Sequence, residues 1–412
     1  MSLVSFLSEN SNNILALALF LLIALFVFLK RKKFSVEGKV IFIYRTKIGL
    51  KLMKSLSKYK RAVNAYSTVG VIAAVVSIFL MIYLSVPYLS MMFYHPTSTI
   101  AGASLVLPVS GVPGVIGVPI LYWFIAIILV VTLHEASHGV VALSKRIRLK
   151  SSGFGFFLGI LPLAFVEPYE KIFAKAKRLD RLRVLSAGSF TNIIMGLIAL
   201  GLFYLAAHYL LAIHGFTLTP LMLKITNVTK NQPAYNAGLP VGALISKING
   251  KSFYSPSQAE SLLSVTPGEP VNLTTSSGAT YSIKTIYNPK INTTTHSYIG
   301  VEALFILPQN SGFLIQPFGY GVNPANGLLP QTVFWLGGLF FWVALIALGI
   351  GLVNFLPIFY ITDGCKIVNE LLGYVIKDKR RLWRVTNAII IAFSVLLLLL
   401  TPLGSALFSA IR

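Results

Sequence analysis

The sequence predicts a polytopic α-helical membrane protein with about six transmembrane helices and one large segment outside the membrane. Of the 412 residues, 55% are hydrophobic and only 11% are charged, whereas soluble domains contain about 25% charged residues. Six apolar runs reach the length of about 20 residues that a membrane-spanning helix needs. Most of the positive charges gather in short stretches between those runs, as in membrane proteins of fixed topology.

This composition excludes several classes of protein. A soluble enzyme could not cover so much apolar surface, and a disordered chain needs low hydrophobicity and high net charge. The single cysteine, Cys365, excludes a disulfide framework and a cysteine-based zinc cluster.

The six candidate spans cover residues 13–29, 66–93, 117–143, 184–213, 332–361 and 385–411. The first is expected to be an uncleaved signal-anchor, because no small-residue cleavage site follows its apolar run. The fifth is interrupted late by Asn354 and Pro357, and a proline breaks the hydrogen-bond pattern of a helix interior.

The distribution of basic residues predicts the orientation. Of the 35 Lys and Arg residues, 28 lie within 30–61, 145–150, 171–183 and 366–384. All four stretches fall on one side if six helices alternate from an outside N-terminus, so they are expected in the cytosol and both termini outside. Nucleic-acid binding is the alternative for such charge, but the charges are divided among short loops beside the membrane, and no nucleic-acid partner is expected.

Residues 214–331 differ in composition from the rest, being rich in Thr, Ser, Asn and Gly with short β-branched runs. Three acceptor sequences for N-glycosylation lie there, at Asn227, Asn272 and Asn292, as is typical of exposed exported segments. The chain is therefore divided into 1–116 (two spans and a basic loop), 117–213 (two spans), 214–331 (an extracytoplasmic domain) and 332–412 (two spans).

The third span contains the pattern His-Glu-x-x-His at His134, Glu135 and His138. Positions i and i+4 share one face of a helix, so both imidazoles can reach one metal ion, and zinc is the natural choice for this donor set. Glu135 can act as a base on an attacking water. From the spacing to Lys145 we expect the pair roughly 10–16 Å from the cytosolic edge of the membrane, where unpaired polar groups are costly.

A catalytic zinc usually has three protein ligands, and the acids available for the third position are Glu167, Glu170 and Asp363. Asp363 follows the interrupted fifth span, and Gly364 permits a tight backbone there. A helix cap or an ion pair with Lys366 is the alternative role for Asp363.

Three motifs together resemble the site-2 protease family of intramembrane zinc metalloproteases, over roughly residues 120–384. They are His-Glu-Ala-Ser-His at 134–138, Ala-Gly-Ser-Phe-Thr-Asn at 187–192, and Asn354-x-x-Pro357 followed by Asp363-Gly364. Two positions depart from the usual motifs: Ser189 stands for a proline, and Thr362 for a leucine.

The resemblance implies specific roles. His134, His138 and Asp363 would bind Zn²⁺, and Glu135 would be the general base. Asn192 and Asn354 would lie near the site and orient the substrate backbone or stabilise the oxyanion, with helix packing as the alternative for both.

The resemblance also assigns two further elements. Gly153–Glu167 is too rich in glycine for a helix and matches a re-entrant β-hairpin whose edge strand receives the substrate; a membrane-surface loop is the alternative. The outer segment, with a core at about 221–306, resembles a circularly permuted PDZ domain of α+β type. In it we expect a strand at 223–229, a turn at Asn249-Gly250, a helix at 255–264 capped by Ser255, and a hairpin of 271–275 with 280–287.

The expected function is that of an intramembrane zinc metalloendopeptidase in the cell membrane. Its partners would be the lipid bilayer and the transmembrane protein substrates that it cleaves. The alternatives are a catalytically silent membrane scaffold that binds through its PDZ domain, and a transporter or channel, which usually shows internal repeats that this sequence lacks.

Overall fold

The computed structural model describes residues 11–38, 40–94, 104–109, 115–218, 220–287, 297–306 and 322–401. The chain forms two compact units, which are considered separately below. The first unit comprises residues 1–203 and 339–412, and the second comprises residues 204–338.

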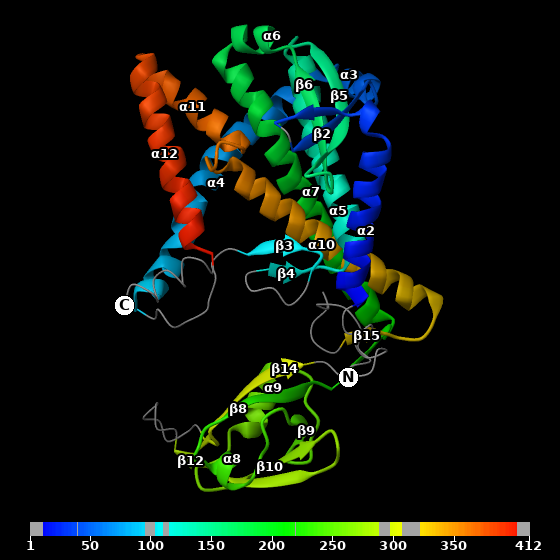
Figure 1. Cartoon of the computed structure of the whole chain (residues 1–412), viewed down its shortest axis with the longest axis vertical. Helices are drawn as coiled ribbons and strands as arrows, with labels where there is room; N and C mark the ends of the chain where they lie inside the picture. Colours follow the sequence, from blue (N-terminus) through cyan, green and yellow to red (C-terminus); the bar gives the residue numbers. More distant parts are fainter. Residues whose placement is uncertain are drawn as a thin grey trace. The chain divides into compact units, whose positions relative to one another are not determined.

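Six helices within the described residues are long and apolar enough to cross a membrane, which confirms the predicted number (Figure 1). They are α2 (Ser11–Leu29), α4 (Lys60–Tyr94), α5 (Ile120–Ser144), α7 (Arg178–Ala212), α10 (Leu328–Phe355) and α12 (Lys379–Leu399).

The fifth span ends earlier than predicted. Helix α10 stops at Phe355 rather than near residue 361, because Pro357 cannot continue it. A turn follows in which Phe359 and Tyr360 adopt left-handed backbone angles, with φ of 52° and 60°. The chain then enters α11 (Asp363–Val375), an amphipathic helix that the sequence analysis did not separate from its surroundings.

The last span also has different bounds from the predicted 385–411. Helix α12 begins at Lys379, where the side chain of Asp378 accepts hydrogen bonds from the first-turn amides of Arg380 and Arg381. Residues 402–411 lie outside the described part of the chain.

Helix α7 lies at the centre of the packing in the first unit. Its Val184 and Ala187 pack with Val141 of α5 and Val63 of α4. On the opposite face of α7, Leu182 and Leu185 form a second buried cluster with residues of α4, α10 and α11, namely Ala74, Phe355 and Ile367. Through these two clusters α7 joins the helices that carry the sequence motifs.

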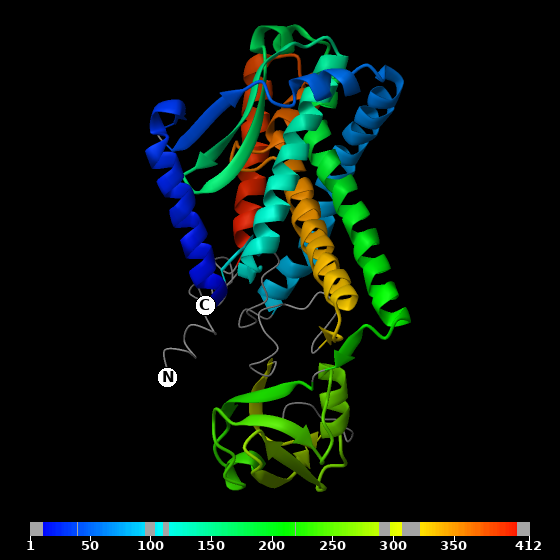
Figure 2. The ribbon, with the colours of Figure 1, turned by 90° about the vertical axis from the view of Figure 1, so that its right-hand side faces the viewer.

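A four-stranded antiparallel sheet lies beside α5 in the first unit (Figure 2). Its strand order is β1 (Ser35–Glu37), β2 (Ile41–Thr46), β5 (Leu149–Phe157) and β6 (Leu161–Pro168). Strands β5 and β6 form a hairpin over the glycine-rich segment. Strands β1 and β2 were not predicted, because the partner of β2 lies more than 100 residues further along the chain.

Glycines in β5 allow the close approach of β2. A Cβ atom at Gly153 or Gly155 would collide with the carbonyl oxygen of Tyr44 or Phe42. The faces left open by these glycines are covered by Phe165 and Leu163 of β6. The glycines that argued against a helix in this segment therefore allow the strands to pack closely.

Short elements complete the first unit. They are a 3-10 turn (Arg31–Lys33), α3 (Leu50–Leu56), α6 (Glu170–Lys175) and the parallel strand pair β3 (Leu105–Leu107) and β4 (Val115–Gly117). The ring of Phe26 in α2 contacts those of Phe34 and Phe156, which fastens the first span to the sheet.

The second unit contains a five-stranded antiparallel sheet in the order β11-β10-β9-β8-β14. The strands are β8 (Met222–Val228), β9 (Leu244–Ile248), β10 (Pro270–Thr275), β11 (Thr280–Lys284) and β14 (Val301–Ile306). Two helices, α8 (Pro233–Asn236) and α9 (Pro256–Leu263), accompany them. The remaining strands form two small pairs: β7 (Phe216–Leu218) with β15 (Val322–Pro324), and β12 (Ile286–Tyr287) with β13 (Ser297–Tyr298).

The local predictions for this unit are confirmed except for one strand end. The expected strand at 223–229 is β8, and the expected hairpin is formed by β10 and β11. Its second strand was predicted to reach residue 287, but β11 ends at Lys284, and residues 286–287 pair with β13 instead. Ser255 caps α9 by accepting a hydrogen bond from the amide of Gln258 at 3.2 Å. Asn249 and Gly250 form a tight turn with positive φ angles. The sequon at Asn292 lies outside the described residues.

Candidate metal centre

Helix α5 brings His134, Glu135 and His138 together, as their spacing predicts. Their ligand atoms lie within 4.8 Å of one another. The two imidazole rings meet edge to face with centroids 4.8 Å apart, and their Nε2 atoms are separated by 3.2 Å. His134 is buried and His138 is half-buried, so the pair points into the protein rather than toward lipid.

Asp363 reaches the same point from another helix. It is the first residue of α11, and its Oδ2 lies 3.2 Å from Nε2 of His134 and 3.3 Å from Nε2 of His138. This oxygen is buried and has no ordinary hydrogen-bond partner within the described residues. Asp363 forms no ion pair there with Lys366, so the structure favours the role of a ligand over that of an ion-pair partner.

The three atoms fit the coordination sphere of zinc. Tetrahedral zinc with donors at about 2.0–2.2 Å places neighbouring donor atoms roughly 3.3 Å apart. Here the three donor atoms form a triangle with edges of 3.2, 3.2 and 3.3 Å. Two imidazoles and one carboxylate are a common donor set for catalytic zinc, and the fourth position is left for water or substrate.

The other ring nitrogen of each histidine is also engaged, and this fixes the direction in which Nε2 points. Nδ1 of His138 lies 2.6 Å from the carbonyl oxygen of Val184, and Nδ1 of His134 lies 3.1 Å from the side-chain amide of Asn192. Both partners belong to α7. Outer contacts of this kind orient metal-binding imidazoles.

Asn192 therefore has a contact that the sequence did not indicate. Its side chain is fully buried and faces an imidazole. The carboxamide can present its oxygen to Nδ1–H of His134 when Nε2 binds a metal. We infer that Asn192 positions His134.

Glu135 is held by the β-hairpin. Its Oε2 accepts a hydrogen bond from the backbone amide of Val166 in β6 at 3.0 Å. Within the described residues, no hydrogen bond engages the other carboxylate oxygen. The carboxylate is thus fixed beside the two imidazoles with one oxygen available to accept a proton.

Two glycines make the convergence possible. A Cβ atom on Gly188 of α7 would lie less than 3.0 Å from Nε2 of both histidines, where the metal ligands meet. A Cβ atom on Gly364 would collide with the carbonyl of Leu356, so only glycine lets α11 begin this close to the end of α10. The sequence motif contained Gly188, but nothing in the local pattern showed that it faces the histidines.

A charged cluster fastens α11 to α7. Glu370 accepts two hydrogen bonds from Arg181, at 2.8 and 2.7 Å, and also lies 3.4 Å from Arg178. The side chains of Arg181 and Glu370 are largely buried, and that of Arg178 is 32% exposed. Two-point arginine–carboxylate contacts fix orientation as well as distance, so this cluster helps to hold Asp363 at the site.

The remaining predicted residues lie elsewhere or have no contact with the histidines. Glu167 accepts hydrogen bonds from Lys150 and Ser151, and the bond from Lys150 is the main cause that lowers the pKa of its carboxyl group. Glu170 is exposed. Asn354 is half-buried in the last turn of α10, and within the described residues its side chain forms no hydrogen bond.

Comparison with known proteins agrees with this geometry. Residues 122–401 match the family described as peptidase family M50. An uncharacterized protein of Methanocaldococcus jannaschii is 30% identical over 247 residues, which is 60% of this chain and 62% of that relative. The chain thus aligns with less than two thirds of the relative's length.

Gly188→Ala is expected to weaken metal binding sharply, because the added methyl group would displace both imidazoles. The control is Gly201→Ala on the same helix, where a Cβ atom meets nothing within 4 Å. Zinc titration of the purified proteins would compare the two. Equal zinc affinity in both variants would contradict the contact of Gly188 with the histidines.

Asn192→Leu is expected to lower zinc affinity by about 10–100-fold, which is the usual effect of removing an outer contact of a histidine ligand. Asn192→Asp keeps an oxygen that can accept the bond from Nδ1 of His134, and it should retain more of the affinity than the leucine variant. If Asn192 served only in helix packing, Asn192→Asp would not retain more zinc affinity than Asn192→Leu.

Proposed function

The chain belongs to peptidase family M50, and we propose that it is a zinc endopeptidase that cleaves transmembrane segments of other membrane proteins. The observation that carries this proposal is the triangle of His134, His138 and Asp363, whose edges match those of a zinc site within a set of membrane-spanning helices. The family and the apolar helices already indicate a membrane metalloprotease.

Each site residue then has a chemical role. His134, His138 and Asp363 would hold the ion, which when bound polarises a carbonyl group and makes water a nucleophile at neutral pH. The free oxygen of Glu135 accepts the proton of the attacking water and passes it to the departing amine. Asn354, whose amide has no partner within the described residues, is available to hydrogen-bond the substrate backbone.

The edge of β6 supports an extended substrate. The amide of Val166 bonds to Glu135, so this residue presents its backbone groups away from β5. Ala164 lies two residues earlier and presents its groups to the same edge, whereas Pro162 and Pro168 have no N–H. A transmembrane helix must unwind before cleavage, and its freed backbone needs partners. We infer that a short extended stretch pairs with this edge, as in β-augmentation.

The basic segments support an orientation for the proposed enzyme. Four short stretches contain 28 of the 35 Lys and Arg residues, and positive loops face the cytosol. This orientation places the zinc site in the inner half of the membrane, so that water enters and one product leaves on the cytosolic side. Such an enzyme would perform regulated intramembrane proteolysis.

We further propose that the second unit is a PDZ-like domain outside the cell membrane. It has a five-stranded antiparallel sheet, two short helices and one buried core. The stretch Gly238-Leu-Pro-Val-Gly242 resembles a Gly-Leu-x-x-Gly motif of PDZ domains, and its two glycines adopt positive φ angles of 72° and 88°. The domain would restrict access of substrates with bulky external parts.

Glu135→Gln is expected to abolish cleavage while zinc binding and fold persist. Glutamine has nearly the same shape but cannot accept the proton, and a general acid–base contributes about 10²–10⁴-fold to the rate. The measurement is cleavage of a panel of single-span proteins by the full chain in proteoliposomes, together with the zinc content.

The control for this prediction is Glu170→Gln, which removes an exposed carboxylate away from the histidines. It should cleave like the unmodified chain. Unchanged turnover in Glu135→Gln would reject the assigned base. Zinc binding without cleavage of any tested protein by the unmodified chain would favour the silent scaffold.

Replacing about residues 221–306 by a flexible linker is expected to leave zinc binding intact, since all proposed site residues lie outside that interval. If the domain filters by size, the shortened chain should cleave substrates with long external parts that the full chain rejects. One substrate with a long and a short external part would be compared. A uniform loss of cleavage would show instead that the domain recruits substrate.

A further inference from the structure

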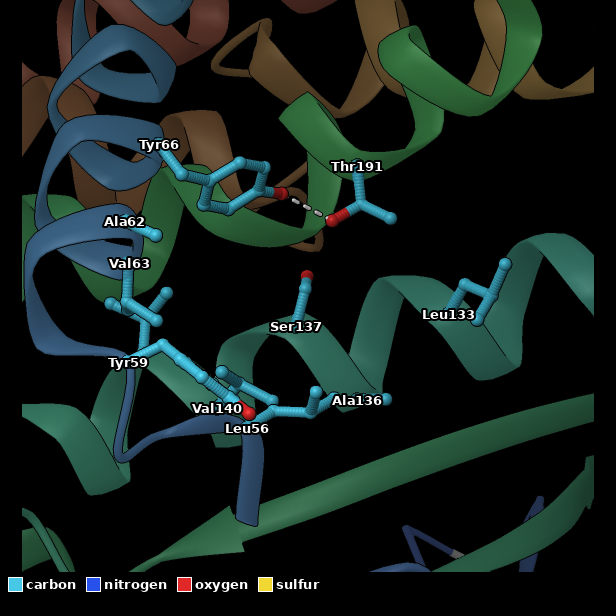
Figure 3. Close-up of a pocket in the computed structure, with 11 residues that line it drawn as sticks. Leu56, Tyr59, Ala62, Val63, Tyr66, Leu133, Ala136, Ser137, Val140 and Thr191 are labelled. Carbon is cyan, nitrogen blue, oxygen red and sulfur yellow. Dashed lines mark hydrogen bonds between the residues drawn. The ribbon is translucent and has the colours of Figure 1, made fainter. Parts of the chain in front are cut away.

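A second feature of the first unit is an apolar groove on the side of α5 that does not carry the hairpin. Its volume is about 460 Å³, and it is lined by side chains of α3, α4, α5 and α7 (Figure 3). Leu56 and Tyr59 line it at one end, and Leu133 and Thr191 line it at the other. It shares α5 with the metal centre but contains none of the proposed ligands.

Apart from the exposed hydroxyl of Tyr59, the polar side-chain groups that line the groove are already engaged. The hydroxyl of Ser137 donates to the carbonyl of His134 at 2.7 Å. The hydroxyl of Tyr66 donates either to the carbonyl of Ala187, 3.0 Å away, or to the hydroxyl of Thr191, which itself donates to that carbonyl at 2.9 Å. The groove therefore offers its occupant an apolar wall rather than hydrogen-bond partners.

The groove is short. The lining residues of α5 run from Leu133 to Val141, which is about 12 Å of helix. A volume of about 460 Å³ over that length is enough room for part of one hydrocarbon chain.

Two positive charges lie next to one end of the groove in the chain. Lys58 and Lys60 flank Tyr59, which lines that end. Both lysines are exposed, and among the described residues neither has an ion pair or a side-chain hydrogen bond. Lys145, by contrast, is engaged with Asn64 and Asp180. Lys58 and Lys60 are thus available to bind an anionic group at this end of the groove.

From this combination we propose that the groove is a binding site for one anionic phospholipid. A hydrocarbon chain occupies the apolar groove, and the phosphate-containing headgroup contacts Lys58 and Lys60. Burial of the lipid's hydrocarbon chain contributes binding free energy that does not depend on charge. The cations select an anionic headgroup over a zwitterionic one. The proposal is independent of the zinc chemistry.

The test uses the full chain in detergent and native mass spectrometry. Phosphatidylglycerol and phosphatidylcholine with identical acyl chains are titrated separately. We expect one tightly held phosphatidylglycerol per chain and much weaker retention of phosphatidylcholine. Equal retention of both lipids, or retention of neither, would overturn the proposal; capture of an apolar protein segment in place of lipid would do the same.

Two pairs of variants locate the site. Ala62→Trp fills the groove, whereas Ala65→Trp places the same side chain on an exposed position of α4 that does not line it. Lys58→Gln with Lys60→Gln removes two cations at the end of the groove, and Lys51→Gln with Lys54→Gln removes two exposed cations from α3.

Ala62→Trp should lose the bound lipid, and Ala65→Trp should keep it. Each cation removed at the end of the groove should weaken phosphatidylglycerol binding by about fivefold, with a smaller effect in the α3 pair. Zinc content and elution volume establish that each variant is folded. If each variant bound lipid as its control does, the proposed site would be disproved. The comparison of the Lys58–Lys60 pair with the Lys51–Lys54 pair tests the site even if Ala62→Trp misfolds.

Discussion

The meeting of two imidazoles and one carboxylate within 3.3 Å is the constraint on which the rest of the first unit depends. A charged acid near the centre of a membrane costs about 2.5–3.5 kcal/mol on insertion scales, so such a group is retained only where it is paired or functional. Around it α5 supplies the two imidazoles, α7 supplies the contact of Asn192 with His134 and the space at Gly188, and α11 supplies Asp363. The broken end of α10, the left-handed residues Phe359 and Tyr360, and the Arg181–Glu370 contact all serve to place α11.

The hairpin of β5 and β6 connects this centre with the surface on which a substrate would lie. One amide of β6 holds Glu135, and the same edge is restricted by prolines at its two ends. Prolines and short strands are common means of limiting unwanted pairing at an exposed edge. Here they leave a narrow set of backbone groups near Glu135. Under the proposed function these groups would align an unwound substrate with the candidate metal centre. Strands β1 and β2 stiffen this hairpin from its other side.

Helix α5 thus has two different environments. One face carries the polar site and the hairpin contact, and another borders the apolar groove toward α4. Because Ser137 lies beside His138 in sequence yet lines the groove, a lipid in that groove would pack directly against the helix that holds two ligands. The second unit has its own buried core, which includes Phe253 and Ile245.

The sequence by itself determined the six spans, the His134–Glu135–His138 motif, and the strands, turn and helix cap of the second unit. These depend on local pattern, namely apolar length, i to i+4 spacing and turn chemistry. The family resemblance already named Asp363 as a ligand, but only the tertiary structure showed its carboxylate 3.2–3.3 Å from both imidazoles. The tertiary structure alone also turned Asn192 toward His134, set Gly188 against both rings and paired β2 with β5. Each of these contacts joins residues far apart in the chain, and their geometry depends on how α5, α7 and α11 pack, which no local spacing encodes.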